Sequence, residues 1–189
     1  MTVGRRAMPL QHDKLEQRIM DLGALQALSN LPRVDDAFCC LGTTIKQAGF
    51  QEAFRRVDHD YVVALAGVGL RAGATQFLLV SAIGADPASR MFYSRVKGEA
   101  EGAVRRLPYR GVQIFRSSLL LGERAEFRLG ERIAALVAPL LSLALVGPLR
   151  RYRPVRAETV ARAMVHIAKE APRGPNVFEY DAIVAAAAS

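Results

Sequence analysis

The chain has 189 residues, of which 51% are hydrophobic, and its formal net charge is +8. The length suits one domain with a substantial core, and the hydrophobic content excludes an intrinsically disordered chain. The basic residues are scattered among leucine and alanine, without the basic helix of a nucleic-acid module. We therefore rank a solvated surface as the best explanation of the net charge, a phosphate-bearing ligand as the second and a nucleic-acid partner as the last.

Strands and helices alternate along the chain. Segments that read as strands lie at residues 2–6, 15–20, 36–41, 77–80, 111–115, 152–155 and 177–180, and those at 36–41 and 77–80 are apolar runs. Helical spacing of apolar residues is found at residues 23–31, 50–72, 92–108 and 157–169. This order predicts a doubly wound α/β fold with a parallel sheet, as one domain over residues 1–189. The alanine-rich tail after residue 180 is expected to fray.

Three features bear on location. Residues 1–10 are basic and lack the apolar core of a signal peptide. Cys39 and Cys40 are adjacent in an apolar run, which predicts reduced and buried strand residues. The apolar segment 133–146 is too short to cross a membrane and indicates a buried helix or a hydrophobic cap. We therefore expect a cytoplasmic protein without a membrane span.

Two features of the sequence are not interpreted as ligand sites. The glycines of segment 67–73 nearly match a dinucleotide fingerprint, but that motif must follow a strand and open a helix. This segment closes a helix instead, so we interpret it as helix packing and a C-cap. His59 and His166 have no metal-ligand spacing around them, so no metal site is predicted.

Ser81, Tyr93 and Lys97 are the candidate catalytic residues. Tyr93 and Lys97 are four apart, so they share one face of a helix, and Ser81 follows the apolar strand just upstream. A phenol needs about 4 kcal/mol of preferential stabilisation to lose three pKa units, and an ammonium about 4 Å away supplies an energy of that order. Lys97 could therefore tune Tyr93, with Ser81 holding a substrate oxygen. The Tyr-x-x-x-Lys spacing alone also arises by chance in many helices.

Three motifs carry a family resemblance: residues 38–44, residues 80–86 and residues 92–99. Together they resemble an atypical, sugar-epimerase-like branch of the short-chain dehydrogenase/reductase superfamily, which includes the human Tat-interacting tumour suppressor and bacterial relatives. The resemblance implies a Rossmann-like, NAD(P)-binding fold. It also implies that Tyr93 is the acid/base, that Lys97 tunes it and contacts the cofactor ribose, and that Ser81 orients the substrate.

The resemblance also assigns cofactor contacts. Basic residues after the second strand of this fold receive the 2′-phosphate of NADP, so Arg5 and Arg6 favour NADP over NAD, although a plain basic N-terminus is the alternative. The other expected contacts follow later strands or lie on the helix with the tyrosine: Asp21, Leu22, Leu41, Gly42, Thr43, Thr44, Tyr93, Lys97, Arg116, Ser117 and Ser118. Ser117 stands where the family usually has proline.

The same resemblance places a small substrate-side region at about residues 122–180. Its lining is expected from the polar segment 123–132 and from around Tyr152. Asp58 lies where the family has a polar residue near the cofactor, although a solvated aspartate explains it nearly as well. The expected partner is a small-molecule substrate, and no nucleic acid is expected. A homo-oligomer is compatible with the sequence.

One part of the expected fold has no counterpart in the sequence. No apolar strand with a glycine-rich loop precedes Arg5, although this fold places such a strand at the centre of its sheet. We expect two unpaired strand edges as a result, and a natural protein that begins roughly thirty residues earlier, by a strand and a helix. An intact N-terminus at Met1 in protein from its host would contradict the longer form.

Two functions compete. The first is an NADP-dependent oxidoreductase or epimerase-like enzyme that uses Ser81, Tyr93 and Lys97. The second is a non-catalytic, NADP-binding redox sensor or adaptor, which the absent glycine-rich loop favours. A nucleic-acid binder, whose affinity would fall steeply with salt, is a distant third.

Overall fold

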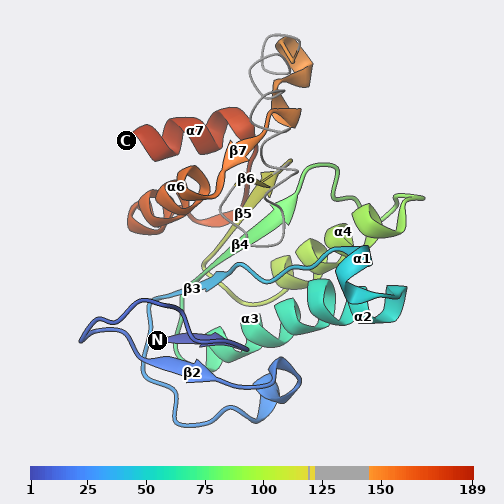
Figure 1. Ribbon diagram of the computed structural model, residues 1–189. Helices are drawn as coiled ribbons and strands as arrows, with labels where there is room; N and C mark the ends of the chain where they lie inside the picture. The colour runs from blue at the N-terminus through green and yellow to red at the C-terminus, as the bar shows by residue number, and fades with distance from the viewer. Residues whose placement is uncertain (119, 122–144) are drawn as a thin grey trace.

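The structure is a computed structural model that describes residues 1–118, 120–121 and 145–189 (Figure 1). Its strands are β1 (Thr2–Gly4), β2 (Gln17–Ile19), β3 (Asp36–Cys39), β4 (Gln76–Ala82), β5 (Gly111–Ser117), β6 (Leu120–Leu121), β7 (Val155–Arg156) and β8 (Gly174–Phe178). Its helices are η1 (Leu22–Ala27), α1 (Ile45–Ala48), α2 (Gln51–Arg55), η2 (Arg56–Asp60), α3 (Tyr61–Arg71), α4 (Phe92–Arg105), η3 (Gly147–Tyr152), α6 (Ala157–Glu170) and α7 (Tyr180–Ala188).

The main sheet has four strands in the order β3-β4-β5-β8, and every strand pair among the described residues is parallel. Strands that follow one another in sequence and pair in parallel need a crossover, which α3, α4 and α6 supply here. The predicted parallel, doubly wound α/β fold is therefore confirmed.

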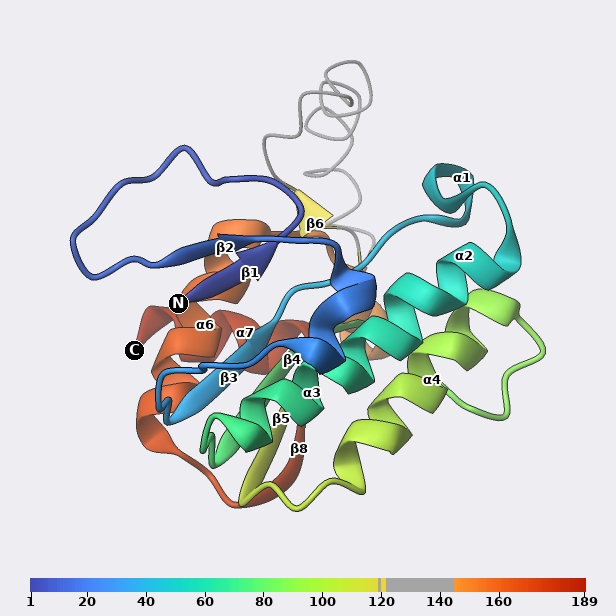
Figure 2. The ribbon, with the colours of Figure 1, turned by 90° about the horizontal axis from the view of Figure 1, so that it is seen from below.

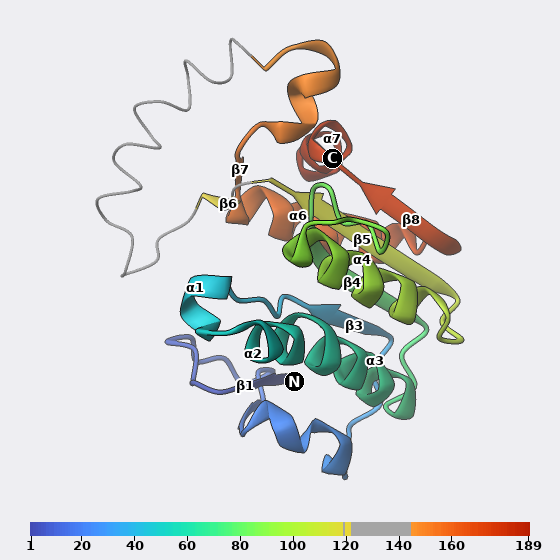
Figure 3. The same cartoon turned by 90° about the vertical axis from the view of Figure 1, so that its right-hand side faces the viewer.

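Helices cover both faces of this sheet, with α3 and α4 on one side and α6 and α7 on the other (Figures 2 and 3). Phe77 and Leu79 of β4 pack toward α3 and α4 with Val62. Leu78, between them, packs toward α6 and α7 with Ile167. Burial on both faces is why these strands read as continuous apolar runs.

The N-terminal strands stand apart from this sheet. Strand β1 pairs with β2 in a separate two-stranded sheet, and β3 is an edge strand of the main sheet. The predicted gap is therefore present, since no strand among the described residues joins β1 to β3.

A π-turn interrupts the long predicted helix at residues 50–72. Helices α2 and α3 are continuous through η2, a π-helical segment that holds Asp58. A π-turn adds one residue to a helical turn and often marks a functional position. Asp58 is only 1% exposed, so this turn directs a carboxylate into the protein.

Three local predictions are wrong. The tail is not frayed, because alanine is the best helix former and Ile183, which is fully buried, anchors α7. Cys40 is exposed, since it faces away from the core that holds Cys39. The strand expected at 152–155 is limited to β7, because Tyr152 ends the short helix η3. The segments 123–132 and 133–146 lie almost wholly outside the described residues.

Candidate functional site

The predicted site residues gather at the carboxyl ends of the parallel strands. Arg5 follows β1, Gly42 lies just beyond β3, and Ser81 and Arg116 are near the ends of β4 and β5. Parallel strands end at the same edge of a sheet, and ligands of open α/β sheets bind in crevices at that edge. Helix α4 follows β4 and carries Tyr93 and Lys97.

Lys97 is fixed by a buried ion pair. Its Nζ lies 2.7 Å from Oδ1 of Asp58, and the two side chains are 9% and 0% exposed. Oδ2 of Asp58 accepts a hydrogen bond of 2.9 Å from the backbone N–H of Thr43, in the loop after β3. A Cβ built at Gly42 would lie 3.4 Å from Asp58 Oδ1 and 3.6 Å from Lys97 Nζ. Asp58 thus ties α4 to the loop that follows β3.

Tyr93 is half-buried beside this pair. Its ring packs against Phe54, with 5.4 Å between the ring centroids. Burial raises the pKa of Tyr93 above its ordinary value of 10.0; the Lys97 charge lowers it and the Asp58 charge raises it. The Lys97 charge therefore acts on the phenol in the expected direction, but burial outweighs it and the Asp58 charge opposes it. The role of Lys97 in tuning Tyr93 stays a prediction.

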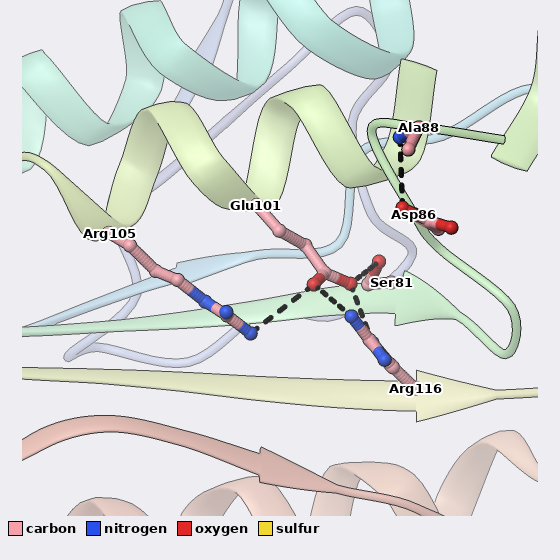
Figure 4. Close-up of polar contacts among 6 residues, drawn as sticks. All are labelled: Ser81, Asp86, Ala88, Glu101, Arg105 and Arg116. Atoms are coloured by element: carbon pink, nitrogen blue, oxygen red, sulfur yellow. Dashed lines mark hydrogen bonds and ion pairs between the residues drawn. The ribbon is translucent and has the colours of Figure 1, made fainter. Parts of the chain in front are cut away.

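Ser81 belongs to a second polar cluster, centred on Glu101 of α4 (Figure 4). Ser81 Oγ donates a hydrogen bond of 2.6 Å to Glu101 Oε1. Arg116 donates to both carboxylate oxygens, at 3.0 Å from Nε and 2.7 Å from Nη2, and Arg105 reaches Oε2 at 3.5 Å. The hydrogen bonds that Arg116 donates to Glu101 raise the pKa of Arg116 above its ordinary value. Glu101 is 2% exposed, and both of its carboxylate oxygens accept hydrogen bonds from these side chains inside the protein.

The two clusters are separate. Within the described part of the chain, no hydrogen bond joins Ser81 to Tyr93. The structure brings Ser81 and Lys97 to one edge of the sheet but gives each its own carboxylate partner. Sequence reasoning missed Glu101, although its position four residues after Lys97 places it on the same helical face.

The expected adenine-side residues have local partners. Arg5 and Arg6 are exposed after β1. Asp21 caps η1, accepting a hydrogen bond of 3.0 Å from the backbone N–H of Gly23. Leu22 is 5% exposed and packs in a core cluster with Leu25, so its backbone rather than its side chain is left for a ligand.

The expected contacts after β3 and β5 are also engaged. Leu41 is partly buried against two core clusters, and Thr44 caps α1 by accepting a hydrogen bond from the Gln47 backbone N–H. Ser117 Oγ donates to the Ser81 carbonyl at 3.4 Å, and Ser118 Oγ donates to the Arg153 carbonyl at 2.7 Å. These hydroxyls stabilise the strand ends, and their role toward a cofactor stays a prediction.

Comparison with known proteins agrees with this fold. No protein-family model matches the chain. The rat protein HTATIP2 is 37% identical over 136 residues, which cover 70% of this chain and 56% of HTATIP2. The mitochondrial protein fmp52 of Emericella nidulans is 36% identical over 115 residues, covering 60% of this chain and 49% of that protein. The chain thus spans about half the length of these curated relatives.

Solved structures share the architecture. MoeE5 in complex with UDP-glucuronic acid and NAD superposes with a TM-score of 0.65 and 17% identity, covering 98% of this chain and 72% of MoeE5. RMD from Pseudomonas aeruginosa, complexed with NADPH, gives a TM-score of 0.57 and 16% identity, covering 92% and 68%. At these identities the likeness shows a Rossmann-like fold.

The relatives correct one prediction. Several FMP52 relatives are mitochondrial proteins by name, which contradicts the cytoplasmic location expected from the sequence. Among the described residues, none of the helices has the length and apolarity that a membrane crossing requires. The same residues hold no cluster of three or more His, Cys, Asp or Glu side chains suited to a metal ion.

Proposed function

We propose that the chain is an NADP-dependent oxidoreductase or epimerase-like protein. The proposal rests on its homology to HTATIP2 and the FMP52 proteins, and it places the chain in the NAD(P)-binding, epimerase-like group of short-chain dehydrogenases/reductases. Its substrate is a small molecule with a carbonyl or hydroxyl group. The observation that carries the proposal is the buried Lys97–Asp58 pair, one helical turn from Tyr93 and directly beside Gly42.

The residues present fit one end of a nicotinamide dinucleotide. Gly42 leaves the space of a Cβ open beside Lys97 and Asp58, where a ribose could approach the loop after β3. The described residues offer no glycine-rich loop at a helix N-terminus for the pyrophosphate. We therefore assign the nicotinamide-ribose end to Gly42, Thr43 and Lys97, and the 2′-phosphate of NADP to Arg5 and Arg6.

Each side chain has a stated task in proton transfer. A bound nicotinamide cofactor would supply the hydride chemistry. The Tyr93 phenol gives or takes the proton on the substrate oxygen, and its raised pKa keeps it protonated in the free protein. Lys97 holds the ribose and supplies the positive charge that a phenolate needs, while Asp58 fixes its position.

Ser81 takes a narrower role than the sequence suggested. Its single proton is donated to Glu101, so its lone pairs are left to accept a hydrogen bond. It can therefore hold a substrate hydroxyl, or the Tyr93 hydroxyl, but it does not donate to a substrate carbonyl while Glu101 holds its proton. We further propose that residues 1–189 form one domain, with a small substrate-side region within about residues 122–180.

A specific observation favours a second candidate function, a non-catalytic redox sensor or adaptor. Ser81 and Tyr93 lie in separate polar clusters, and the pKa of Tyr93 is raised rather than lowered. Such a protein would bind NADPH without turning over a substrate, so cofactor binding and catalysis need separate tests.

Titration of NADPH and NADH, followed by cofactor fluorescence, tests the binding. We expect saturable binding with NADPH preferred, and a loss of about tenfold in affinity for Lys97→Met, because one charged hydrogen bond to the ribose is removed. Lys169→Met, which changes an exposed lysine of α6, is the matched control and should bind as the unmodified chain does. Equal affinity in both variants would remove Lys97 from the site.

The NADP preference has its own test. Arg5→Ala combined with Arg6→Ala should weaken NADPH binding and leave NADH binding unchanged, since only NADP carries the 2′-phosphate. Arg173→Ala, at an exposed arginine between α6 and β8, is the control. Parallel losses for both cofactors would contradict the assignment.

A further inference from the structure

The short helix η3 exposes a line of apolar side chains. Val146, the N-cap residue, Leu149 and Tyr152 are 59%, 50% and 42% exposed. A 3₁₀ helix has three residues per turn, so side chains three residues apart lie one above another. The three residues therefore form one line, which we call the η3 stripe. Single exposed apolar residues are ordinary on a protein surface, whereas a contiguous group indicates an interaction site.

Helix η3 projects from the described fold. None of its residues is buried, and a Cβ built at Gly147, its first residue, would meet no described atom within 4 Å. Figures 1 and 3 show η3, in orange, beyond α7 and at the end of the molecule opposite β1 and β2. The stripe is thus carried on a projection rather than on a broad face.

The segment around η3 carries positive charge. Residues 145–156 include four arginines and no acidic residue. The Arg151 guanidinium lies over the Tyr152 ring, 5.1 Å from its centroid, and so sits directly beside the stripe. In the part of the chain that the structure describes, neither Arg151 nor Arg156 forms an ion pair. Both charges are therefore available to an anionic partner.

Two contacts hold η3 in place. Arg150 forms an ion pair of 2.8 Å with Asp181 of α7. Arg153 Nε donates a hydrogen bond of 2.8 Å to the Leu145 carbonyl, which joins the two ends of the projection. A surface that is already fixed loses less conformational entropy when it binds.

We propose that the η3 stripe docks the protein on the surface of a bilayer that contains anionic lipid. Apolar and aromatic side chains enter the boundary between headgroups and acyl chains, while arginines bind lipid phosphates and keep their charge in the headgroup region. The net charge of +8 adds attraction to an anionic surface. The stripe holds none of the candidate catalytic or cofactor-binding residues, so this inference is independent of the proposed function.

The shape of the projection favours a bilayer over a protein partner. A standard protein interface buries about 800 Å² on each partner, over roughly 20–30 residues. Helix η3 has six residues and offers one line of three apolar side chains. Such a projection can enter a soft interface, but it is small for a stable protein interface.

A single tryptophan reports on one position, because the sequence contains none. We would record the fluorescence of Leu149→Trp with vesicles of phosphatidylcholine alone and with about one-third phosphatidylserine. The emission should move to shorter wavelength only with the anionic vesicles, and about 0.5 M salt should reduce the change. Leu10→Trp, at a leucine that is 57% exposed between β1 and β2, is the matched control and should show no shift.

Cosedimentation with the anionic vesicles separates the apolar contribution from the charge. Leu149→Glu should lower the partition coefficient at least about tenfold, because it removes an apolar anchor and places negative charge beside the arginines. Leu10→Glu changes the net charge equally and should bind nearly as the unmodified chain does. Arg151→Glu should weaken binding more than Arg173→Glu, at an exposed arginine just before β8.

Four outcomes would overturn the proposal. The first is no cosedimentation with anionic vesicles at low salt. The second is an equal loss in Leu149→Glu and Leu10→Glu, which would show adsorption by net charge alone. The third is the same fluorescence shift of Leu149→Trp with inorganic phosphate alone, which would assign the arginines to a soluble anion. The fourth is a shift without vesicles that grows with protein concentration alongside a dimer in sedimentation, which would assign the stripe to a second copy.

Discussion

Helix α4 carries two buried charged residues one turn apart, and the protein holds them in different ways. Glu101 is surrounded by Ser81, Arg116 and Arg105, which together occupy both carboxylate oxygens. Lys97 has one carboxylate partner, Asp58, and lies beside a glycine. The difference indicates that the Glu101 cluster is architectural, whereas the Lys97 pair retains donors for a ligand.

The largest effect is expected from a substitution that removes Glu101, the centre of the architectural cluster. Glu101→Ala should lower the free energy of unfolding by about 3–5 kcal/mol, because it leaves the Arg116 guanidinium without its buried partner. Glu99→Ala, on the same helix, removes a partly exposed pair with Arg55 and should cost less than about 1 kcal/mol. Urea unfolding of both variants checks this contrast, and equal losses would contradict it.

A smaller effect is expected from the Lys97 pair. Asp58→Asn removes the charge but keeps an oxygen that can still accept hydrogen bonds from Lys97 and from the Thr43 backbone N–H, so we expect a smaller loss of about 1–3 kcal/mol in stability. The pKa of Tyr93 should fall, because the Asp58 charge raises it in the parent chain. Tyrosine absorbance titrations, with Tyr93→Phe to identify the signal, measure this shift. Asp60→Asn, at an exposed aspartate of η2, should leave it unchanged.

Cys39, a neutral thiol near the Lys97–Asp58 pair, is expected to make the stability of the fold sensitive to high pH. Burial raises the pKa of Cys39 from 9.0 to about 12, so the unfolded chain releases this proton first as pH rises. Stability from this group is complete below pH 9.0 and is lost between 9.0 and about 12, amounting to about 1.4 kcal/mol by pH 10. Cys39→Ala should flatten the fall in unfolding free energy above pH 9 more than Cys40→Ala does. The same slope in both variants would contradict this.

The smallest effect belongs to a charge pair on the surface. Glu158 and Arg162 of α6 are joined at 2.7 Å, with side chains 60% and 68% exposed. Glu158→Ala should change stability by less than about 0.5 kcal/mol, because water and salt screen such a pair. Thermal unfolding at low and high salt checks it, and a loss as large as that of Glu101→Ala would remove the distinction between buried and exposed pairs.

The sequence predicted the elements better than it predicted their polar contacts. Apolar runs and helical periodicity located β3, β4, β5, α4 and α6, because burial on one or both faces leaves a local pattern. The tail was misjudged, since the packing of Ile183 against distant residues is not visible in local composition. The break between β1 and β3 could be foreseen because fold rules require a central strand.

The sequence located the candidate site residues in the fold, but it did not give their partners. Tyr93, Lys97 and Ser81 lie where their spacing placed them, at one edge of the sheet. Their carboxylate partners could not be derived from spacing: Asp58 turns inward only because of a π-turn, and Glu101 meets Arg116 only because α4 packs across β5. These contacts depend on tertiary packing, and so does the burial that raises the pKa of Tyr93.

The central claim is that the Lys97 side of α4 faces the cofactor. We would label the tyrosine ring carbons with 13C, identify Tyr93 and Tyr109 by substitution with phenylalanine, and follow both NMR signals during addition of NADPH. Tyr109 donates a hydrogen bond to the Ala66 carbonyl and lies just before the amino end of β5, away from the carboxyl ends of the strands, so it serves as an internal control. The account predicts a saturable shift of the Tyr93 signal with Tyr109 unmoved. A Tyr93 signal that stays unchanged while NADPH binds would contradict it.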